Sequence, residues 1–162
     1  MNRILKYFIC SLFTILSCVA QTQIEIINAD IISFNKKNNK DRQVLTGNVK
    51  TKHNEQFMYC DSAYYYANEN KIEAFSNILI WQGDTLSLEG DYLIYYGNNQ
   101  LAEIEKNVHF KHNEMNLISE QLKYNFLINK GFFDQKATIY EKNKSLTSKQ
   151  GAYYASSEKF DF

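Results

Sequence analysis

The sequence predicts an all-β protein built from stacked repeats of short strands, and three observations lead to this prediction. Aromatic residues are abundant (12 Tyr, 11 Phe, 1 Trp) and proline is absent, and aromatic and β-branched side chains favour strands. The stretch from Gly83 to Tyr96 alternates apolar and polar residues with the two-residue period of a half-buried strand. Degraded copies of this stretch recur about every 30 residues, a spacing typical of stacked supersecondary units. The length of 162 residues suits one domain.

Residues 1–20 differ from the rest of the chain and have the pattern of a secretory signal peptide. Arg3 and Lys6 give a positive start, Tyr7–Val19 is uncharged and mostly apolar, and small residues at Cys18–Ala20 suit cleavage. The apolar run is too short for a comfortable membrane span. A lipoprotein signal, with Cys18 as the lipidated residue, is a less favoured alternative, because the preceding residues fit such a signal poorly. We therefore expect an exported protein.

Charge and cysteine content limit the function classes further. Without residues 1–20 the chain has 16 basic and 18 acidic residues, a net charge of about −2. Because nucleic-acid binding needs clustered Lys and Arg, a nucleic-acid partner is not expected. Cys10 and Cys18 would leave with the signal peptide, so Cys60 would be alone. We expect Cys60 to be a buried, inert thiol, with an intermolecular disulfide as the less favoured alternative.

The mature chain begins with strand signals at Ile24–Ile27 and Ile31–Ile32, which predict a first strand pair, followed by a polar, exposed connection at Asn35–Arg42. The repeats follow. An Asn-Val-like motif recurs at Gly47-Asn48-Val49, Ser76-Asn77-Ile78, Lys106-Asn107-Val108 and, more weakly, Ala137-Thr138-Ile139. Phe162 stands where a fifth copy would start, so either the fold is trimmed there or the chain is a fragment of a longer array.

A second motif, also present in each repeat, consists of an apolar residue, a small residue, usually an acid, and a tyrosine. Its copies are Met58-x-Cys60-Asp61-x-Ala63-x-Tyr65, Leu88-x-Gly90-Asp91-x-Leu93-x-Tyr95, Leu117-x-Ser119-Glu120-x-Leu122-x-Tyr124 and Leu146-x-Ser148-Lys149-x-Gly151-x-Tyr153. The apolar positions change parity after the small residue and the acid. A change of parity requires an extra residue, so Gly90-Asp91 is predicted to be a bulge or corner between two short strands.

No catalytic constellation is present in the sequence, and an enzyme is not expected. His53 and His112 follow lysines in two Lys-His-Asn-Glu turns, beside Glu55 and Glu114, and a solvated turn is favoured over a metal pair. The serines Ser62, Ser119 and Ser148 are explained by packing. The acids Asp61, Asp91 and Glu120 are predicted to be corner residues whose short side chains bond the backbone. No cofactor and no metal are expected.

The apolar residues of bent strands suggest two arrangements. They can pack against each other as an ordinary core, or they can line a trough that binds acyl chains. The residues alone favour the core.

The two motifs together resemble the OstA-like family, to which the lipopolysaccharide-transport protein LptA and the periplasmic domain of LptD belong. Gly47-Asn48-Val49 followed by Cys60-Asp61-x-Ala63-x-Tyr65 carries the family's rhythm, and the resemblance covers residues 44–155. Lys149 and Gly151 depart from the pattern in the last repeat. The resemblance implies an incomplete, β-taco-like jelly-roll of antiparallel strands whose open side holds the acyl chains of lipid A.

The resemblance further implies a periplasmic lipopolysaccharide-binding carrier or bridge that takes part in lipopolysaccharide transport to the outer membrane. Its partners would be lipopolysaccharide and other transport proteins, joined by edge-strand addition, and a head-to-tail homo-oligomer is a further option. The inward, lipid-binding candidates, chosen by strand parity, are Val49, Ile78, Ile80, Leu88, Leu93, Val108, Phe110, Leu117, Leu122 and Ile139.

Two alternative functions stay open. The chain could be an architectural periplasmic segment of a larger outer-membrane assembly protein, or an exported β-solenoid that binds carbohydrate through aromatic rows on its outer face. The expected organisation is a signal peptide at 1–20 and one OstA-like domain at 21–162, with repeats near 44–74, 75–104, 105–133 and 134–162.

Overall fold

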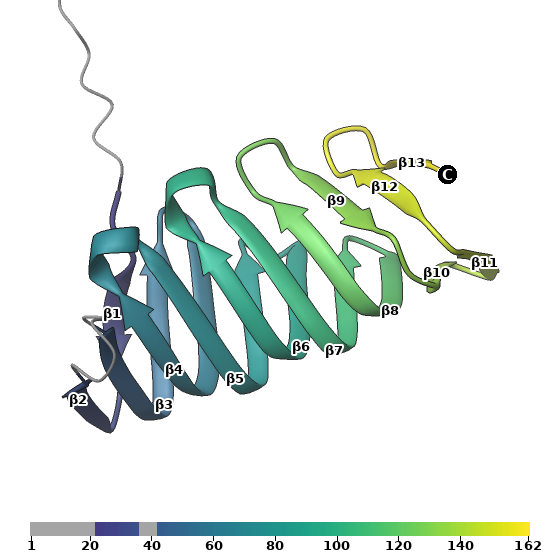
Figure 1. Cartoon of the computed structure of the whole chain (residues 1–162). Helices are drawn as coiled ribbons and strands as arrows, with labels where there is room; N and C mark the ends of the chain where they lie inside the picture. Colours follow the sequence, from purple (N-terminus) through teal and green to yellow (C-terminus); the bar gives the residue numbers. More distant parts are fainter. Residues whose placement is uncertain (1–21, 36–41) are drawn as a thin grey trace, which may run out of the picture.

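The computed structural model describes residues 22–35 and 42–162, which form one open antiparallel sheet of 13 strands (Figure 1). The all-β prediction is confirmed, and the described residues contain no α-helix, only short 3-10 turns at Ala67–Glu69 and Gly97–Asn99. The predicted signal peptide, including Cys18, and most of the connection at Asn35–Arg42 lie outside the described residues. The strands are β1 (Glu25–Asn28), β2 (Ile31–Asn35), β3 (Arg42–His53), β4 (Gln56–Tyr66), β5 (Lys71–Gln82), β6 (Leu86–Tyr96), β7 (Leu101–His112), β8 (Met115–Asn125), β9 (Lys130–Phe133), β10 (Ala137–Glu141), β11 (Lys144–Ser148), β12 (Gly151–Tyr154) and β13 (Lys159–Asp161).

The long strands β3 to β8 form a meander in which each strand pairs with the next along the chain. Each of these strands bends near its middle, so that the sheet folds over on itself along one edge (Figure 1). The bend divides the meander into two walls. The first wall contains residues 49–53, 56–60, 78–82, 86–90, 108–112 and 115–119, and the second wall contains residues 42–46, 62–66, 71–75, 92–96, 101–105 and 121–125. Beyond β8, β10 continues the first wall and β9 continues the second.

The bends are β-bulges produced by pairs of residues with positive φ. Ser76 (φ 63°) and Asn77 (φ 51°) together lie opposite the single residue Asp91, between the pairs Phe75–Tyr92 and Ile78–Gly90. Asparagine tolerates this left-handed conformation better than most side chains do. The same arrangement occurs at Gly47-Asn48 opposite Asp61, and at Lys106-Asn107 opposite Glu120.

The predicted corner at Gly90-Asp91 is confirmed, and so is the change of parity. Leu88 and Gly90 are buried before the corner, and Leu93 and Tyr95 are buried after it. The extra residue lies on the neighbouring strand: across the bend β5 keeps its even-numbered positions buried, Ala74 before and Ile78 after, whereas β6, with one residue fewer there, changes parity. An apolar set therefore faces the inside on both walls.

The hydrogen bonds of the acids differ from the prediction. Asp61 and Asp91 accept hydrogen bonds from asparagine side chains, Asn77 Nδ2 at 2.7 Å and Asn107 Nδ2 at 2.5 Å, rather than from the backbone. In three of the four repeats, the side chain of the small residue of the motif makes the backbone contact instead, and Gly90 has no side chain to do so. Ser119 Oγ donates to the Gln121 carbonyl at 2.9 Å, and the equivalent donors Cys60 and Ser148 contact the carbonyls two residues further on.

The two ends of the chain depart from this pattern. Strands β1 and β2 both pair with β3 and not with each other. The prediction that they pair with each other is therefore wrong. In the fourth repeat, residues 134–136 lie between β9 and β10, and none of these described residues has a positive φ. The sequence there lacks the asparagine that forms the other corners, so the long strand is interrupted instead of bent.

Candidate functional site

The predicted lipid-binding residues lie together in the space between the two walls. Each of them belongs to one continuous apolar core, and their exposed fractions range from 0% to 6%. Val49, Ile78, Ile80, Leu88, Val108, Phe110, Leu117 and Ile139 come from the first wall and from β10, and Leu93 and Leu122 come from the second wall. In this structure the apolar side chains of the two walls pack against each other. A ligand can reach them only where the walls part.

The edge opposite the corners, where the turns of both walls lie, is called the mouth here. Two contacts between a histidine of the first wall and a tyrosine of the second cross it. His53 Nδ1 shares a hydrogen bond of 2.7 Å with Tyr95 Oη, and His112 Nδ1 shares one of 2.8 Å with Tyr153 Oη. In both contacts the rings meet edge to face, with centroids 5.6 Å and 5.8 Å apart. We call them the first and second cross-wall pairs.

The interpretation of the two histidines as solvated turn residues is therefore wrong. His53 ends β3 and is only 4% exposed, and His112 ends β7. The turns consist of the Asn-Glu residues that follow each histidine. Within the described residues, no group of three or more His, Cys, Asp and Glu side chains is arranged to hold a metal ion.

The proton positions in the first cross-wall pair follow from the second nitrogen of His53. His53 Nε2 lies 2.9 Å from the Thr22 carbonyl oxygen, which can only accept a hydrogen bond. In a neutral imidazole, Nε2 then carries the proton and Nδ1 accepts from the hydroxyl of Tyr95. Burial raises the pKa of Tyr95, so its hydroxyl stays protonated at neutral pH and can donate.

Thr22 also connects both walls at the N-terminal end of the mouth. Its carbonyl accepts a hydrogen bond from Asn70 Nδ2 at 2.9 Å, and Ile24 N donates to Asn70 Oδ1 at 2.9 Å. Asn70 lies in a second-wall turn with φ 47° and is 1% exposed. Sequence reasoning missed Thr22 and Asn70. The only available signal was the place of Asn70 in the turn after a repeated tyrosine.

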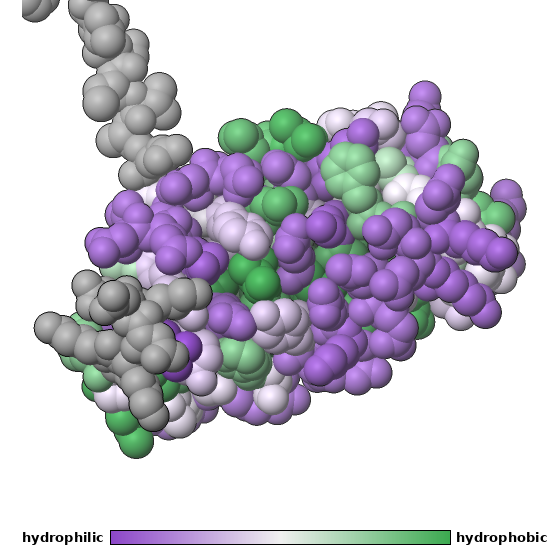
Figure 2. Space-filling view, viewed as in Figure 1, coloured by the Kyte–Doolittle hydropathy of each residue, from purple (hydrophilic) through white to green (hydrophobic). Residues whose placement is uncertain are grey.

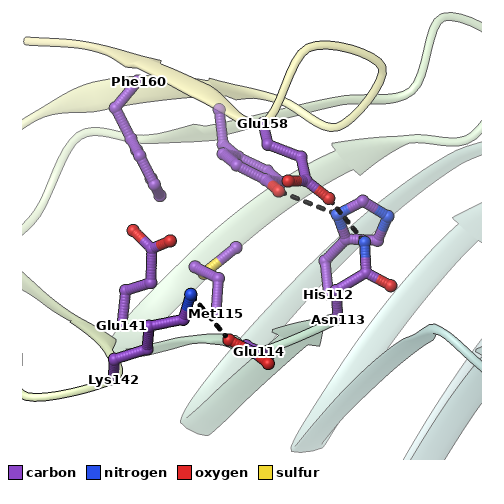
Figure 3. A pocket seen from close by; sticks show the side chains of 9 residues that line it. His112, Asn113, Glu114, Met115, Glu141, Lys142, Glu158 and Phe160 are labelled. Atoms are coloured by element: carbon purple, nitrogen blue, oxygen red, sulfur yellow. Dashed lines mark hydrogen bonds and ion pairs between the residues drawn. The ribbon is translucent and has the colours of Figure 1, made fainter.

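The second cross-wall pair lies at the other end of the mouth, in a hollow of about 350 Å³ (Figure 3). Beside it, Asn113 Nδ2 donates to Glu158 Oε1 at 2.5 Å, which adds another contact between turns of the two walls. Burial, together with the carboxylates of Glu158 and Glu141, raises the pKa of Tyr153 to about 12. Tyr153 therefore also keeps its proton and can donate to His112.

The remaining candidate residues have structural roles. Cys60 is fully buried, and burial raises the pKa of its thiol to about 12, which makes it inert at neutral pH. The hydroxyls of Ser119 and Ser148 donate to backbone carbonyls. On the outer faces, Phe57 stacks on Trp81 with a centroid distance of 5.4 Å, as cross-strand aromatic pairs do.

The chain matches the family model of OstA-like proteins over residues 21–162, and it therefore belongs to this family. No curated protein matches the chain. Membership relates the chain to a transport and binding family of the periplasm that is associated with lipopolysaccharide. Within residues 22–35 and 42–162, no helix is long and apolar enough to cross a membrane.

Proposed function

We propose that the protein is a periplasmic carrier or bridge that binds lipopolysaccharide by its acyl chains and takes part in lipopolysaccharide transport to the outer membrane. One observation carries this proposal. Within the described residues, a single apolar core runs between two walls that are connected covalently along the corners, and polar contacts such as the two cross-wall pairs join the walls at the mouth. Such hydrogen bonds contribute only about 1 kcal/mol each, and an acyl chain that enters can replace the apolar contacts that the walls lose, so the walls can part at the mouth at a modest net cost. Acyl chains would then occupy the space lined by the predicted residues.

Family membership supports the periplasmic location, and the predicted signal peptide at 1–20 would direct export there. Lipid anchoring at Cys18 stays the less favoured alternative. The protein has no proposed catalytic role, cofactor or metal.

The two ends of the sheet have exposed edges at which partner proteins could bind. Strand β2 ends one side with Ile31 and Phe34 exposed, and the opposite end exposes Leu146 and Phe162. Unpaired strand edges with apolar side chains are suited to strand addition. We propose that other lipopolysaccharide-transport proteins, or further copies of this chain arranged head to tail, bind at these edges.

The experiment that tests the proposal compares two forms of the ligand. Residues 21–162 are titrated by calorimetry with lipopolysaccharide and with the same polysaccharide from which all acyl chains have been removed. Binding of lipopolysaccharide alone is the expected result. Equal binding of both would contradict acyl-chain recognition and would favour the carbohydrate-binding alternative.

One observation favours the carbohydrate-binding alternative. Tyr64, Phe75 and Tyr92 form a second row of aromatic contacts on the outer face of the second wall, with centroids 5.2 Å and 5.6 Å apart. A carbohydrate site there would lose polysaccharide binding in the variant Phe75→Ala, whereas acyl-chain binding between the walls would persist.

A further inference from the structure

The mouth has three equivalent positions along its length, and the middle one lacks the contact that closes its neighbours. The residues that end β3, β5 and β7 at the mouth are His53, Gln82 and His112, and the matching tyrosines of the second wall are Tyr95, Tyr124 and Tyr153. Each histidine bonds the tyrosine that lies 41 or 42 residues further along the chain. By the same spacing, Tyr124 is the tyrosine that belongs to Gln82.

Gln82 does not form this contact. Its side-chain oxygen accepts from Gln56 Nε2 at 3.2 Å, and its Nε2 donates to Glu55 Oε2 at 3.4 Å, so the amide lies along the first wall instead of across the mouth. Tyr124 is 0% exposed, and no atom of the described residues is a hydrogen-bond partner of its hydroxyl. A buried hydroxyl without a partner is unfavourable. The Tyr124 hydroxyl therefore points to a ligand group that can form a hydrogen bond with it.

A cavity of about 340 Å³ lies at this middle position, between the two walls. Gln82, Leu86 and His112 line it from the first wall, and Tyr124, Asn129 and Ser156 line it from the second wall and its turns. The next inward residues toward the corners are Leu88 and Leu122, both of which belong to the apolar core. The cavity thus extends from the polar rim of the mouth to Leu86 and Tyr124, the outermost members of the apolar core at this position.

We propose that the gap between Gln82 and Tyr124 is the lateral entry for an acyl chain, and that the Tyr124 hydroxyl donates a hydrogen bond to the ester or amide carbonyl that joins this chain to its polar headgroup. This inference rests on the proposed function. It adds where the acyl chain enters and which polar group of the protein recognises the lipid.

The chemistry of the site favours a carbonyl acceptor. Burial raises the pKa of Tyr124, so that its hydroxyl stays protonated and offers a donor at neutral pH. In an amphipathic lipid the acyl carbonyl lies at the boundary between the apolar chain and the polar headgroup. Tyr124 lies at the corresponding boundary of the protein, between the cavity and the core. The hydroxyl and the carbonyl therefore meet when the chain enters the core.

The test uses two lysophosphatidylethanolamines of equal chain length, one with an ester-linked acyl chain and one with an ether-linked alkyl chain that lacks the carbonyl. Both are titrated, below the concentration at which they form micelles, into the wild-type protein and the variants Tyr124→Phe and Tyr95→Phe. The wild type is expected to bind the ester lipid about fivefold more tightly, the effect of one hydrogen bond. Tyr124→Phe should remove this preference, and Tyr95→Phe should retain it.

The outcomes separate the inference from the proposed function. Equal affinity of the wild type for the two lipids, or a preference that survives in Tyr124→Phe, would overturn the role of the hydroxyl and leave acyl-chain binding intact. If neither lipid binds the wild type, the proposed function itself fails. Circular dichroism of each variant verifies that the sheet is folded.

A second variant tests the position of the entry. Gln82→His places a histidine at the site equivalent to His53 and His112, where it can pair with Tyr124 and close the gap. We expect a higher thermal midpoint of unfolding and about fivefold weaker binding of both lipids, because one more hydrogen bond must break before a chain enters. Unchanged binding of both lipids would contradict entry at this position.

Discussion

His53 and His112 show how a repeated polar residue can serve the interior of an open sheet. Their partners, Tyr95 and Tyr153, lie more than one repeat further along the chain. The sequence predicted solvated turns at the histidines because the two Lys-His-Asn-Glu segments occupy equivalent places in two repeats. The contacts with the tyrosines could not be predicted, because the bend of the whole sheet decides which residues of the two walls face each other.

The three tyrosines of the mouth can be compared through matched replacements by phenylalanine. Tyr95→Phe and Tyr153→Phe each remove a hydroxyl that is bonded to a histidine, whereas Tyr124→Phe removes one without a partner among the described residues. We expect the first two variants to lower the free energy of unfolding by about 1 kcal/mol and the third to leave it unchanged or raise it slightly. Urea denaturation measures all three. Equal losses in the three variants would contradict the described pairing.

The buried thiol and phenol predict a fall in stability at alkaline pH. Burial raises the pKa of Cys60 from 9.0 to about 12 and, with nearby carboxylates, that of Tyr153 from 10.0 to about 12. Because the folded state holds these protons more tightly, their contribution is complete below about pH 9 and is lost as pH rises toward 12. Urea denaturation at a series of pH values should show this fall. In Cys60→Ala the fall should begin nearer pH 10, and an identical profile would contradict the assignment to Cys60.

At the scale of the strand, the corners explain why a short motif repeats. Asn-Val supplies a residue that accepts positive φ followed by an apolar residue, and the small residue and acid on the neighbouring strand complete the bulge. The change of parity in the copies was enough to predict the corner at Gly90-Asp91. The bond from Asn77 to Asp61 could not be predicted, because it joins neighbouring strands across the bend.

Replacement of Asn77 separates the two roles of a corner asparagine. Asn77→Ala loses the hydrogen bond to Asp61 and keeps a Cβ at φ 51° without the polar side chain that makes this conformation tolerable, whereas Asn77→Gly loses the hydrogen bond but also removes the Cβ. We expect a loss of about 2 kcal/mol for alanine and about 1 kcal/mol for glycine in the free energy of unfolding. Chemical denaturation of both variants tests this order. A glycine variant that is less stable than the alanine variant would be inconsistent with a strained corner.

At the scale of the whole molecule, parity within the repeat was sufficient to find the core. The predicted lipid-binding residues are all buried between the walls, because the bulges keep one apolar set inside on each side of the bend. The contacts that close the mouth, and the interruption between β9 and β10, could not be predicted, since they depend on which repeats face each other and on a missing asparagine. The domain limits at 21–162 and the limits of the repeats remain predictions.

A charge in the core should be far more harmful than one at the mouth. Leu93 is 0% exposed, so Leu93→Asp would bury an unpaired carboxylate and should lower the free energy of unfolding by more than about 3 kcal/mol. Asn54 is exposed, and Asn54→Asp retains the oxygen that accepts from Thr22 Oγ1, so this control should change stability by less than about 0.5 kcal/mol. Thermal and urea unfolding measure both. A similar, small change for the two variants would contradict the packed core.

Photocrosslinking shows whether acyl chains enter the space between the walls. A photoreactive amino acid is introduced singly at Leu93, at Phe110 and, as an exposed control, at Asn54. Each purified protein is irradiated with lipopolysaccharide. If acyl chains lie between the walls, crosslinks form from the two core positions and none form from Asn54. Equal labelling at all three positions would contradict acyl-chain entry between the walls.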